Sequence, residues 1–336
     1  MDPSQLRQIA QRKCQDILFC VELSDDNSEA WVGSSDANVY CVDLTSESMA
    51  RVPMGGDGHA SYVTGVCRYG NVMITSGYDK HLVWWDTDSR ESVRKIVAHN
   101  KWIRSVAFTP DGSRIISIAD DMRVRVWEAS TADLIGDVSD HAVMTQQNYP
   151  SMLYALDVSP DGELFATADR VGHIAVWETE SLKKIQQFDA PKMYTWDPKQ
   201  RRHSTGGIRS LAFSPDGKRL AAGGIGHVGN IDHLGGPSRI EIFDLESGSQ
   251  VLEIEDNKKQ GLVEQIAWQK DGEWILAVGG ANNGFLSVFH AGDGKLIHQV
   301  DHPGHVHAMW HDEDFLNLHI AAHENMTHWT MREQEV

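Results

Sequence analysis

Two stretches of the sequence repeat the side-chain types that hydrolases use for nucleophilic catalysis. Each stretch holds a histidine, a hydroxyl residue, an aspartate and a tryptophan: His59, Thr75, Asp79 and Trp85, then His99, Ser117, Asp121 and Trp127. In both sets the hydroxyl residue lies ten positions, and the aspartate six positions, before the tryptophan. A Ser–His–Asp triad occurs once per active site and works beside an oxyanion hole. Recurrence at a fixed spacing, completed by a tryptophan, favours a buried structural network over a catalytic triad.

Histidines gather in two other places where a ligand or a metal could bind. The last eighth of the chain contains His298, His302, His305, His307, His311, His319, His323 and His328. A glycine-rich segment, 226–236, adds His227, Asp232 and His233, but no spacing among these residues matches a known zinc motif. The sequence also lacks a phosphate loop, a dinucleotide fingerprint and a nucleophile elbow. We therefore expect no catalytic residue, no cofactor and no metal, and we interpret the chain as non-enzymatic.

Short apolar runs on either side of a Pro-Asp-Gly turn indicate the elements that hold these residues. Such turns occur at 110–112, 160–162 and 215–217. Proline fixes φ and Asp-Gly tolerates the left-handed region, so each turn predicts a tight β-hairpin. One further position, mostly aromatic, recurs at Val42, Trp85, Trp127, Trp177, Phe243, Phe289 and Trp329. Four strands in a period of about 40–45 residues are typical of a β-propeller, and seven positions predict an all-β, seven-bladed ring of four-stranded antiparallel blades.

The repeats resemble those of the WD-repeat β-propeller family over nearly the whole chain, although Trp85-Asp86 is the one strict Trp-Asp pair. The resemblance implies that the two sets above are structural tetrads. In the fourth expected blade His141, Thr167 and Trp177 match, whereas Val171 stands where the aspartate should be. The resemblance also implies that an N-terminal strand completes the last blade and closes the ring. The expected domain is a single propeller over residues 6–332, with short tails at 1–5 and 333–336.

Charge and composition restrict the classes of partner. The chain has 30 Lys and Arg against 48 Asp and Glu, a net charge of −18, whereas a nucleic-acid binder needs a basic surface. No apolar run approaches the ~20 residues that span a bilayer, and the four cysteines show no CxxC spacing. We therefore expect a cytoplasmic protein that contacts neither nucleic acid nor membrane. The expected state is a monomeric propeller within a complex of other proteins.

Four insertions between the repeats indicate where a partner binds. They are segments 142–152, 191–206, 226–237 and 281–284, and propeller geometry places all of them on one face, over the fourth to sixth expected blades. Loops on a rigid repeat scaffold often carry function, and aromatic and arginine side chains favour protein contacts. The predicted partner-binding residues are Met193, Tyr194, Trp196, Arg201, Arg202, His227 and His233. The alternative is that Tyr194 and Trp196 only pack the long loop onto the propeller.

We interpret the chain as a non-catalytic scaffold or adaptor that binds proteins on this face. The alternative is a propeller that binds a small ligand or a metal through histidine-rich loops, as a sensor or an enzyme. That alternative requires carboxylates and histidines that converge at the ends of the inner strands.

Overall fold

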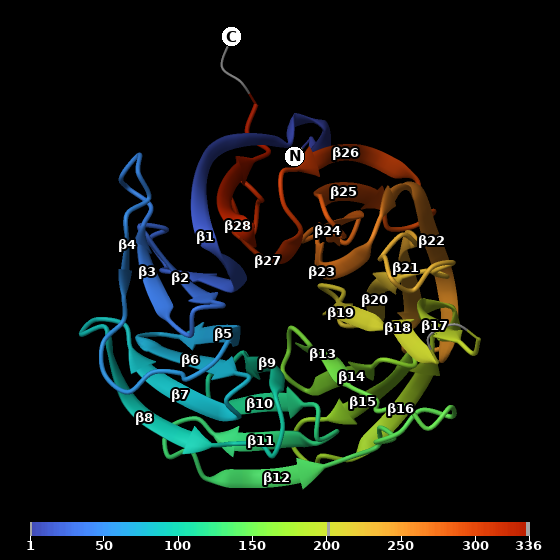
Figure 1. Cartoon of the computed structure of the whole chain (residues 1–336), viewed down its shortest axis with the longest axis horizontal. Helices are drawn as coiled ribbons and strands as arrows, with labels where there is room; N and C mark the ends of the chain where they lie inside the picture. Colours follow the sequence, from blue (N-terminus) through green and yellow to red (C-terminus); the bar gives the residue numbers. More distant parts are fainter. Residues whose placement is uncertain (1, 200–201, 334–336) are drawn as a thin grey trace.

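The computed structural model describes residues 2–199 and 202–333, which form a ring of antiparallel sheets around a central channel (Figure 1). One six-stranded sheet contains, in spatial order, β27 (Val306–His311), β28 (Leu318–Thr330), β1 (Arg7–Leu23), β2 (Glu29–Ser34), β3 (Val39–Asp43) and β4 (Arg51–Pro53). Two four-stranded sheets follow along the chain: β5 (Val63–Tyr69), β6 (Val72–Gly77), β7 (His81–Asp86) and β8 (Glu91–Val97), then β9 (Ile103–Phe108), β10 (Arg114–Ala119), β11 (Val124–Glu128) and β12 (Leu134–Val138).

Three more four-stranded sheets complete the ring. They are β13 (Leu153–Val158), β14 (Leu164–Asp169), β15 (His173–Glu178) and β16 (Lys184–Asp189); β19 (Ile208–Phe213), β20 (Arg219–Ile225), β21 (Pro237–Asp244) and β22 (Ser249–Gln260); and β23 (Leu262–Trp268), β24 (Trp274–Gly280), β25 (Gly284–His290) and β26 (Leu296–His302). A separate hairpin pairs β17 (Tyr194–Asp197) with β18 (His203–Gly206), and two 3-10 turns are η1 (Pro3–Gln5) and η2 (Pro191–Met193). No helix in the described part of the chain has the length and apolar character to cross a membrane.

The prediction of seven four-stranded blades is wrong, because six blades surround the channel and one of them has six strands. The 17-residue β1 is responsible. Its first half pairs with β28, from Arg7 opposite Thr330 onward, and its second half pairs with β2, from Leu18 opposite Ser34 onward. No glycine or proline interrupts β1, so the strand continues from the C-terminal repeat into the N-terminal one. The same pairing joins the two ends of the chain and closes the ring.

The Pro-Asp-Gly segments form the tight turns that join the two innermost strands of three sheets: β9 to β10, β13 to β14 and β19 to β20. Gly112, Gly162 and Gly217 have φ of +71°, +75° and +67°, a region that glycine enters without strain. The aspartate fixes each turn with its side chain: Asp111 Oδ1 accepts hydrogen bonds from Thr109 Oγ1 at 2.6 Å and from the Ser113 amide at 3.1 Å. The local sequence therefore determines where each inner strand reverses.

Apolar side chains fill the spaces between neighbouring sheets. Ile116 and Val126 of one sheet pack with Phe165 and Trp177 of the next, and all four side chains are buried. The rings of Phe165 and Trp177 stack with their centroids 6.0 Å apart. Because each sheet buries both faces in this way, the core is a circle of interfaces and the sheets have fixed positions around the channel.

The first predicted tetrad residues form one continuous hydrogen-bonded chain. His59 Nδ1 lies 3.0 Å from Asp79 Oδ1 and its Nε2 lies 2.8 Å from Thr75 Oγ1, while Trp85 Nε1 donates to the same hydroxyl at 2.7 Å. Thr75 is fully buried, so its hydroxyl is not accessible to a substrate. Equivalent contacts join His99, Ser117, Asp121 and Trp127.

The β13–β16 sheet contains a third complete set. The spacing of the other sets predicts the aspartate at position 171, where the chain has valine, but this prediction is wrong, since Asp169 supplies the carboxylate and its Oδ2 lies 3.0 Å from His141 Nδ1. His141 Nε2 lies 2.8 Å from Thr167 Oγ1, which accepts a hydrogen bond from Trp177 Nε1 at 3.0 Å. The aspartate is the last residue of β14 rather than a turn residue. Its side chain still reaches the histidine because the strand ends beside it.

Candidate binding site at the channel mouth

The strands nearest the channel each carry a β-bulge near the face of the inter-sheet loops. In β1, β5, β9, β13, β19, β23 and β27 the register shifts at one residue; these residues are Phe19, Thr64, Arg104, Tyr154, Arg209, Glu264 and His307. A bulge leaves one residue unpaired and re-aims its side chain. All of these residues line one cavity of about 690 Å³. The bulges therefore direct a set of side chains into the mouth of the channel.

Arginine side chains surround one tyrosine in this mouth. The Cζ atoms of Arg209, Arg104 and Arg170 lie 3.6, 5.3 and 5.8 Å from the centroid of the Tyr154 ring, within the range of cation–π attraction. Arg170 Nη2 also donates to the Tyr154 hydroxyl at 2.9 Å. Burial raises the pKa of Tyr154, but the charges of Arg209, Arg170 and Arg104 outweigh it, and the pKa lies below its usual value. Three guanidinium groups thus gather around Tyr154, and the carboxylate of Asp120 offsets the charge of Arg104.

Two of these three arginines have hydrogen-bond donors that the fold does not use. Arg104 is the exception, because it donates to Asp120 through Nε at 2.8 Å and through Nη2 at 2.6 Å. The Nε atoms of Arg170 and Arg209 are buried and have no hydrogen-bond partner among the residues that the structure describes. An unpaired buried donor costs about 1–3 kcal/mol. The mouth is therefore suited to a carboxylate, which binds guanidinium groups with charge-assisted hydrogen bonds.

Aromatic side chains extend this cluster onto the surface. Trp102, which precedes β9, is 45% exposed and stacks on Tyr78 with the ring centroids 4.4 Å apart. Tyr62 is 43% exposed, and its ring centroid lies 5.5 Å from those of Tyr78 and Phe19. Exposed aromatic groups beside arginines are typical of the residues that contribute most to protein–protein binding.

Three of the predicted insertions pack against each other beside the mouth. Tyr149, from the first insertion, has its ring 6.0 Å from that of Trp196 in the β17–β18 hairpin. The Arg170 guanidinium carbon lies 5.4 Å from the Tyr149 ring centroid. The amide of Val228, from the third insertion, donates to Thr195 Oγ1 at 3.0 Å. The hairpin is therefore continuous with the arginine–tyrosine cluster, and together they form a single surface.

The predicted partner-binding residues differ in how accessible they are. Met193 is fully buried and packs in the core between the β13–β16 and β19–β22 sheets, so it cannot contact a partner. Tyr194 and Trp196 are half-buried. Arg201 lies outside the described residues. The exposed members of the set are Arg202, His227 and His233.

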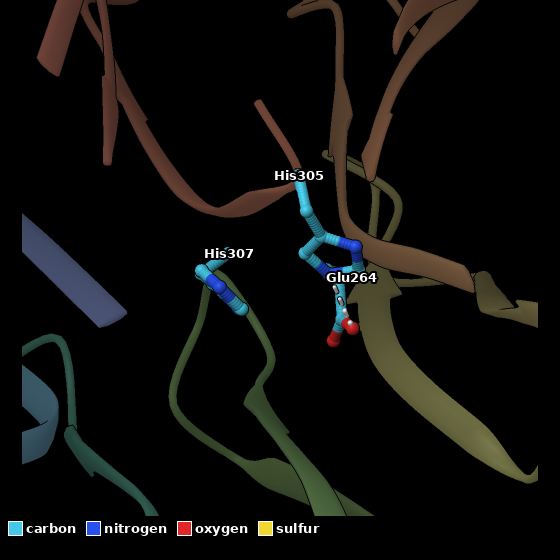
Figure 2. A group of neighbouring side chains, drawn as sticks. All are labelled: Glu264, His305 and His307. Carbon is cyan, nitrogen blue, oxygen red and sulfur yellow. Dashed lines mark hydrogen bonds and ion pairs between the residues drawn. The ribbon is translucent and has the colours of Figure 1, made fainter. Parts of the chain in front are cut away.

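Glutamate and histidine occupy the next part of the mouth, beside Arg209. His305 Nε2 lies 3.1 Å from Glu264 Oε1, and His307 lies next to both (Figure 2). Within the described residues, three potential metal ligands converge at this one place. His227, Asp232 and His233, which the sequence suggested as alternative ligands, do not form such a group.

Sequence reasoning missed the channel-mouth residues, although a signal for them is present. Arg104 and Arg209 directly follow Ile103 and Ile208, the buried first residues of β9 and β19. A charged residue in second position of an apolar inner strand faces either the core or the channel. The periodicity of the sequence does not distinguish these positions, because the bulge that re-aims the side chain is a property of the pairing.

Comparisons with known proteins agree with the repeat architecture. The family described as "WD domain, G-beta repeat" matches residues 54–86, 90–128 and 196–227. The family described as "Anaphase-promoting complex subunit 4 WD40 domain" matches residues 237–314.

Several curated relatives are similar over part of their length. Eukaryotic translation initiation factor 3 subunit I of Candida albicans is 26% identical over 215 residues, which cover 60% of this chain and 52% of the relative. The protein of the same name from Scheffersomyces stipitis is 24% identical over 233 residues, 68% of this chain and 59% of the relative. Nuclear distribution protein PAC1 of Arthroderma otae is 28% identical over 212 residues, 56% of this chain and 42% of the relative. The chain thus spans about half the length of the curated relatives that it matches.

Proposed function

Because the chain belongs to the WD-repeat family, we propose that it is a non-catalytic scaffold whose loop-bearing face binds a partner protein. The relatives named as subunits of initiation factor 3 are, by that name, parts of an assembly. We extend this role to the chain as a proposal, together with a cytoplasmic location within a protein complex.

The observation that carries the proposal is the continuous aromatic and arginine surface at the channel mouth. Trp102 supplies exposed apolar area, and Arg170 and Arg209 supply buried donors without partners among the described residues. Desolvated arginine and tryptophan side chains at the centre of a patch contribute much of the binding energy in protein interfaces. The Pro-Asp-Gly face lacks the insertions that enlarge this surface.

The charge of the mouth identifies the kind of partner segment. On a chain of net charge −18, the guanidinium groups of Arg170 and Arg209, which have unused Nε donors among the described residues, favour acidic over basic side chains beside Tyr154. We therefore propose that the partner inserts an Asp- or Glu-containing segment beside Tyr154. Trp102 and the β17–β18 hairpin would contact apolar groups on either side of that segment.

Affinity capture with matched variants tests the proposal. Trp102→Ala removes the exposed ring at the mouth. Tyr69→Ala is the control, because Tyr69 is 49% exposed and is the last residue of β5, at the end of the strand that lies on the opposite face. We expect Trp102→Ala to reduce the recovery of partners at least tenfold at unchanged thermal stability, and Tyr69→Ala to leave it unaltered. Equal recovery by both variants would reject this face as the binding site.

A further inference from the structure

We propose that Glu264, His305 and His307 bind a divalent transition-metal ion of the zinc class at the channel mouth, with His323 as the fourth ligand. The sequence predicted no metal, and its periodicity gave no reason to bring position 264 near position 305. The fold does so because β23 and β27 are neighbouring inner strands. Glu264 and His307 occupy their bulges, and His305 directly precedes β27 (Figure 2).

The distances agree with a tetrahedral ion. Zinc lies about 2.0–2.2 Å from nitrogen and oxygen ligands, so ligand atoms around it are about 3.3 Å apart. His305 Nε2 and Glu264 Oε1 are 3.1 Å apart, already one edge of such a site. The ligand atoms of Glu264, His305 and His307 all lie within 4.8 Å of one another. A closure of at most about 1.5 Å, which side-chain rotation can supply, completes the geometry.

The hydrogen bonding of His305 presents its lone pair to this site. Its Nδ1 lies 3.0 Å from the carbonyl oxygen of Ala281, and a carbonyl only accepts, so Nδ1 carries a hydrogen. In the neutral imidazole Nε2 is then an unprotonated acceptor, and it faces a carboxylate. Two acceptors at this distance require a cation between them, either a proton or a metal ion. Metal-binding histidines commonly donate their second N–H to a backbone carbonyl, as His305 does.

His323 gives the site its third nitrogen and its fourth ligand. Its Nδ1 lies 3.2 Å from His307 Nε2, another separation that matches a ligand edge around zinc. Its ring centroid is 5.4 Å from that of His307 and 6.4 Å from that of His305. Three imidazoles and one carboxylate, with no thiolate, form a donor set that zinc accepts.

The surroundings allow an ion to enter and to be held. The side chains of His305 and Glu264 are 8% and 18% exposed, and Glu264 and His307 line the 690 Å³ cavity, so the channel provides the entry path. His323 is exposed and can turn toward the ion. The positive charge of Arg209 lies nearby and disfavours binding of the metal ion, whereas the negative charge of the Glu264 carboxylate favours it. An ion here would connect two sheets next to the place where β1 closes the ring.

Metal titration of the full, untagged chain tests the proposal. The protein is stripped with a chelator, dialysed and titrated with CoCl₂ and ZnCl₂. We expect one equivalent of cobalt to give the visible d–d absorption of a four-coordinate site, and zinc to displace it. We also expect a zinc excess of 100 times the Kd to raise the unfolding midpoint by about 4–6 °C.

Matched variants identify the ligands. Glu264→Gln and His307→Ala should each lose the cobalt absorption and at least 90% of the bound zinc. His233→Ala, which removes an exposed histidine elsewhere on the same face, should keep both. Circular dichroism of the metal-free proteins separates loss of ligand from loss of fold; if His307→Ala does not fold, the isosteric Glu264→Gln decides. A wild-type chain that retains no stoichiometric metal, or variants that bind as the wild type does, would overturn the proposal.

Discussion

Substitution of Asp169 should weaken the β13–β16 sheet far more than substitution of its neighbour Val171. The Asp169 carboxylate accepts three hydrogen bonds: from His141 Nδ1 at 3.0 Å, and from the amides of Val171 and His173, each at 3.0 Å. The residue is 1% exposed, so water replaces these contacts poorly. Asp169→Ala leaves one buried imidazole N–H and two amides without an acceptor, and each such group costs about 1–3 kcal/mol.

The Val171 amide lies in the β14–β15 turn and the His173 amide at the first residue of β15. Both can partly relax toward solvent, so we expect Asp169→Ala to lower the free energy of unfolding by about 3–4 kcal/mol. Asp169→Asn keeps an acceptor for the amides and loses the charge-assisted bond to His141, which corresponds to about 1–2 kcal/mol. Val171→Ala removes two methyl groups from a half-buried side chain and should cost less than about 1 kcal/mol.

Urea unfolding at pH 7.5, followed by tryptophan fluorescence, measures these differences from the transition midpoint and slope. Hydrogen exchange of the β14 and β15 amides then shows whether the loss is local to this sheet. The reasoning is refuted if Asp169→Ala unfolds at the same urea concentration as Val171→Ala. It is also refuted if Val171→Ala is the more damaging change, because the spacing inferred from the other tetrads would then be the relevant one.

Three further changes have expected outcomes. Burial raises the pKa of Asp157 to about 7, although the hydrogen bond from the Phe213 amide lowers it. Since the carboxyl of the unfolded chain loses its proton near pH 4, the stability of the fold falls as the pH rises from about 4 to 7. Asp157→Asn should therefore increase the free energy of unfolding by about 2–4 kcal/mol at pH 8 but change it little below pH 4. Solvent in the channel reaches part of the Asp157 side chain, so the expected gain extends down to about 2 kcal/mol. Equal gains at pH 5 and pH 8 in denaturant titrations would exclude a raised pKa as the cause. Leu6→Ala should cost about 2–4 kcal/mol, because Leu6 is 4% exposed and packs with Trp329 where the ring closes; an unchanged calorimetric midpoint would contradict that role. Trp196→Ala should reduce partner recovery several-fold while lowering the unfolding midpoint by only a few degrees, and a loss of stability without a loss of capture would assign Trp196 to loop packing alone.

Local spacing predicted the repeating elements well, because each turn and each tetrad depends on residues close in sequence. Pro110, Asp111 and Gly112 specify their hairpin by their own backbone preferences and side-chain contacts. The number of blades depends instead on whether a strand continues between repeats. In β1 nothing in the sequence marks the point where pairing passes from β28 to β2, so counting repeats overestimated the number of separate sheets.

The spacing of the tetrad failed for a related reason. Asp79 and Asp121 lie in the turns after their strands, whereas Asp169 is itself the last residue of β14. The distance from aspartate to tryptophan therefore changes by two residues while the contact with histidine is kept. A fixed-spacing pattern cannot represent such a shift, since the contact depends on the direction of the side chain.

The sequence indicated a loop-bearing face for the candidate site, which stays a prediction, but it did not indicate the residues at the channel mouth. The insertions indicated a loop-bearing side, and the β17–β18 hairpin packs against Tyr149 and Val228 of two other insertions. Arg104, Tyr154 and Arg209 are separated by about 50 residues each in sequence and meet because neighbouring inner strands present their bulges to one cavity. Met193 shows the opposite error, because a residue within an exposed loop was taken as accessible and is buried.

Site-specific photo-crosslinking tests the central claim, that a partner protein binds at the channel mouth, most directly. A photoreactive phenylalanine analogue replaces either Trp102 or Tyr69, both exposed aromatic positions but on opposite faces of the ring, and irradiated complexes are analysed by mass spectrometry. The account predicts that position 102 forms covalent adducts with a partner, through an acidic segment of it, and that position 69 forms none. Adducts with the same partner at position 69 and none at position 102 would contradict it.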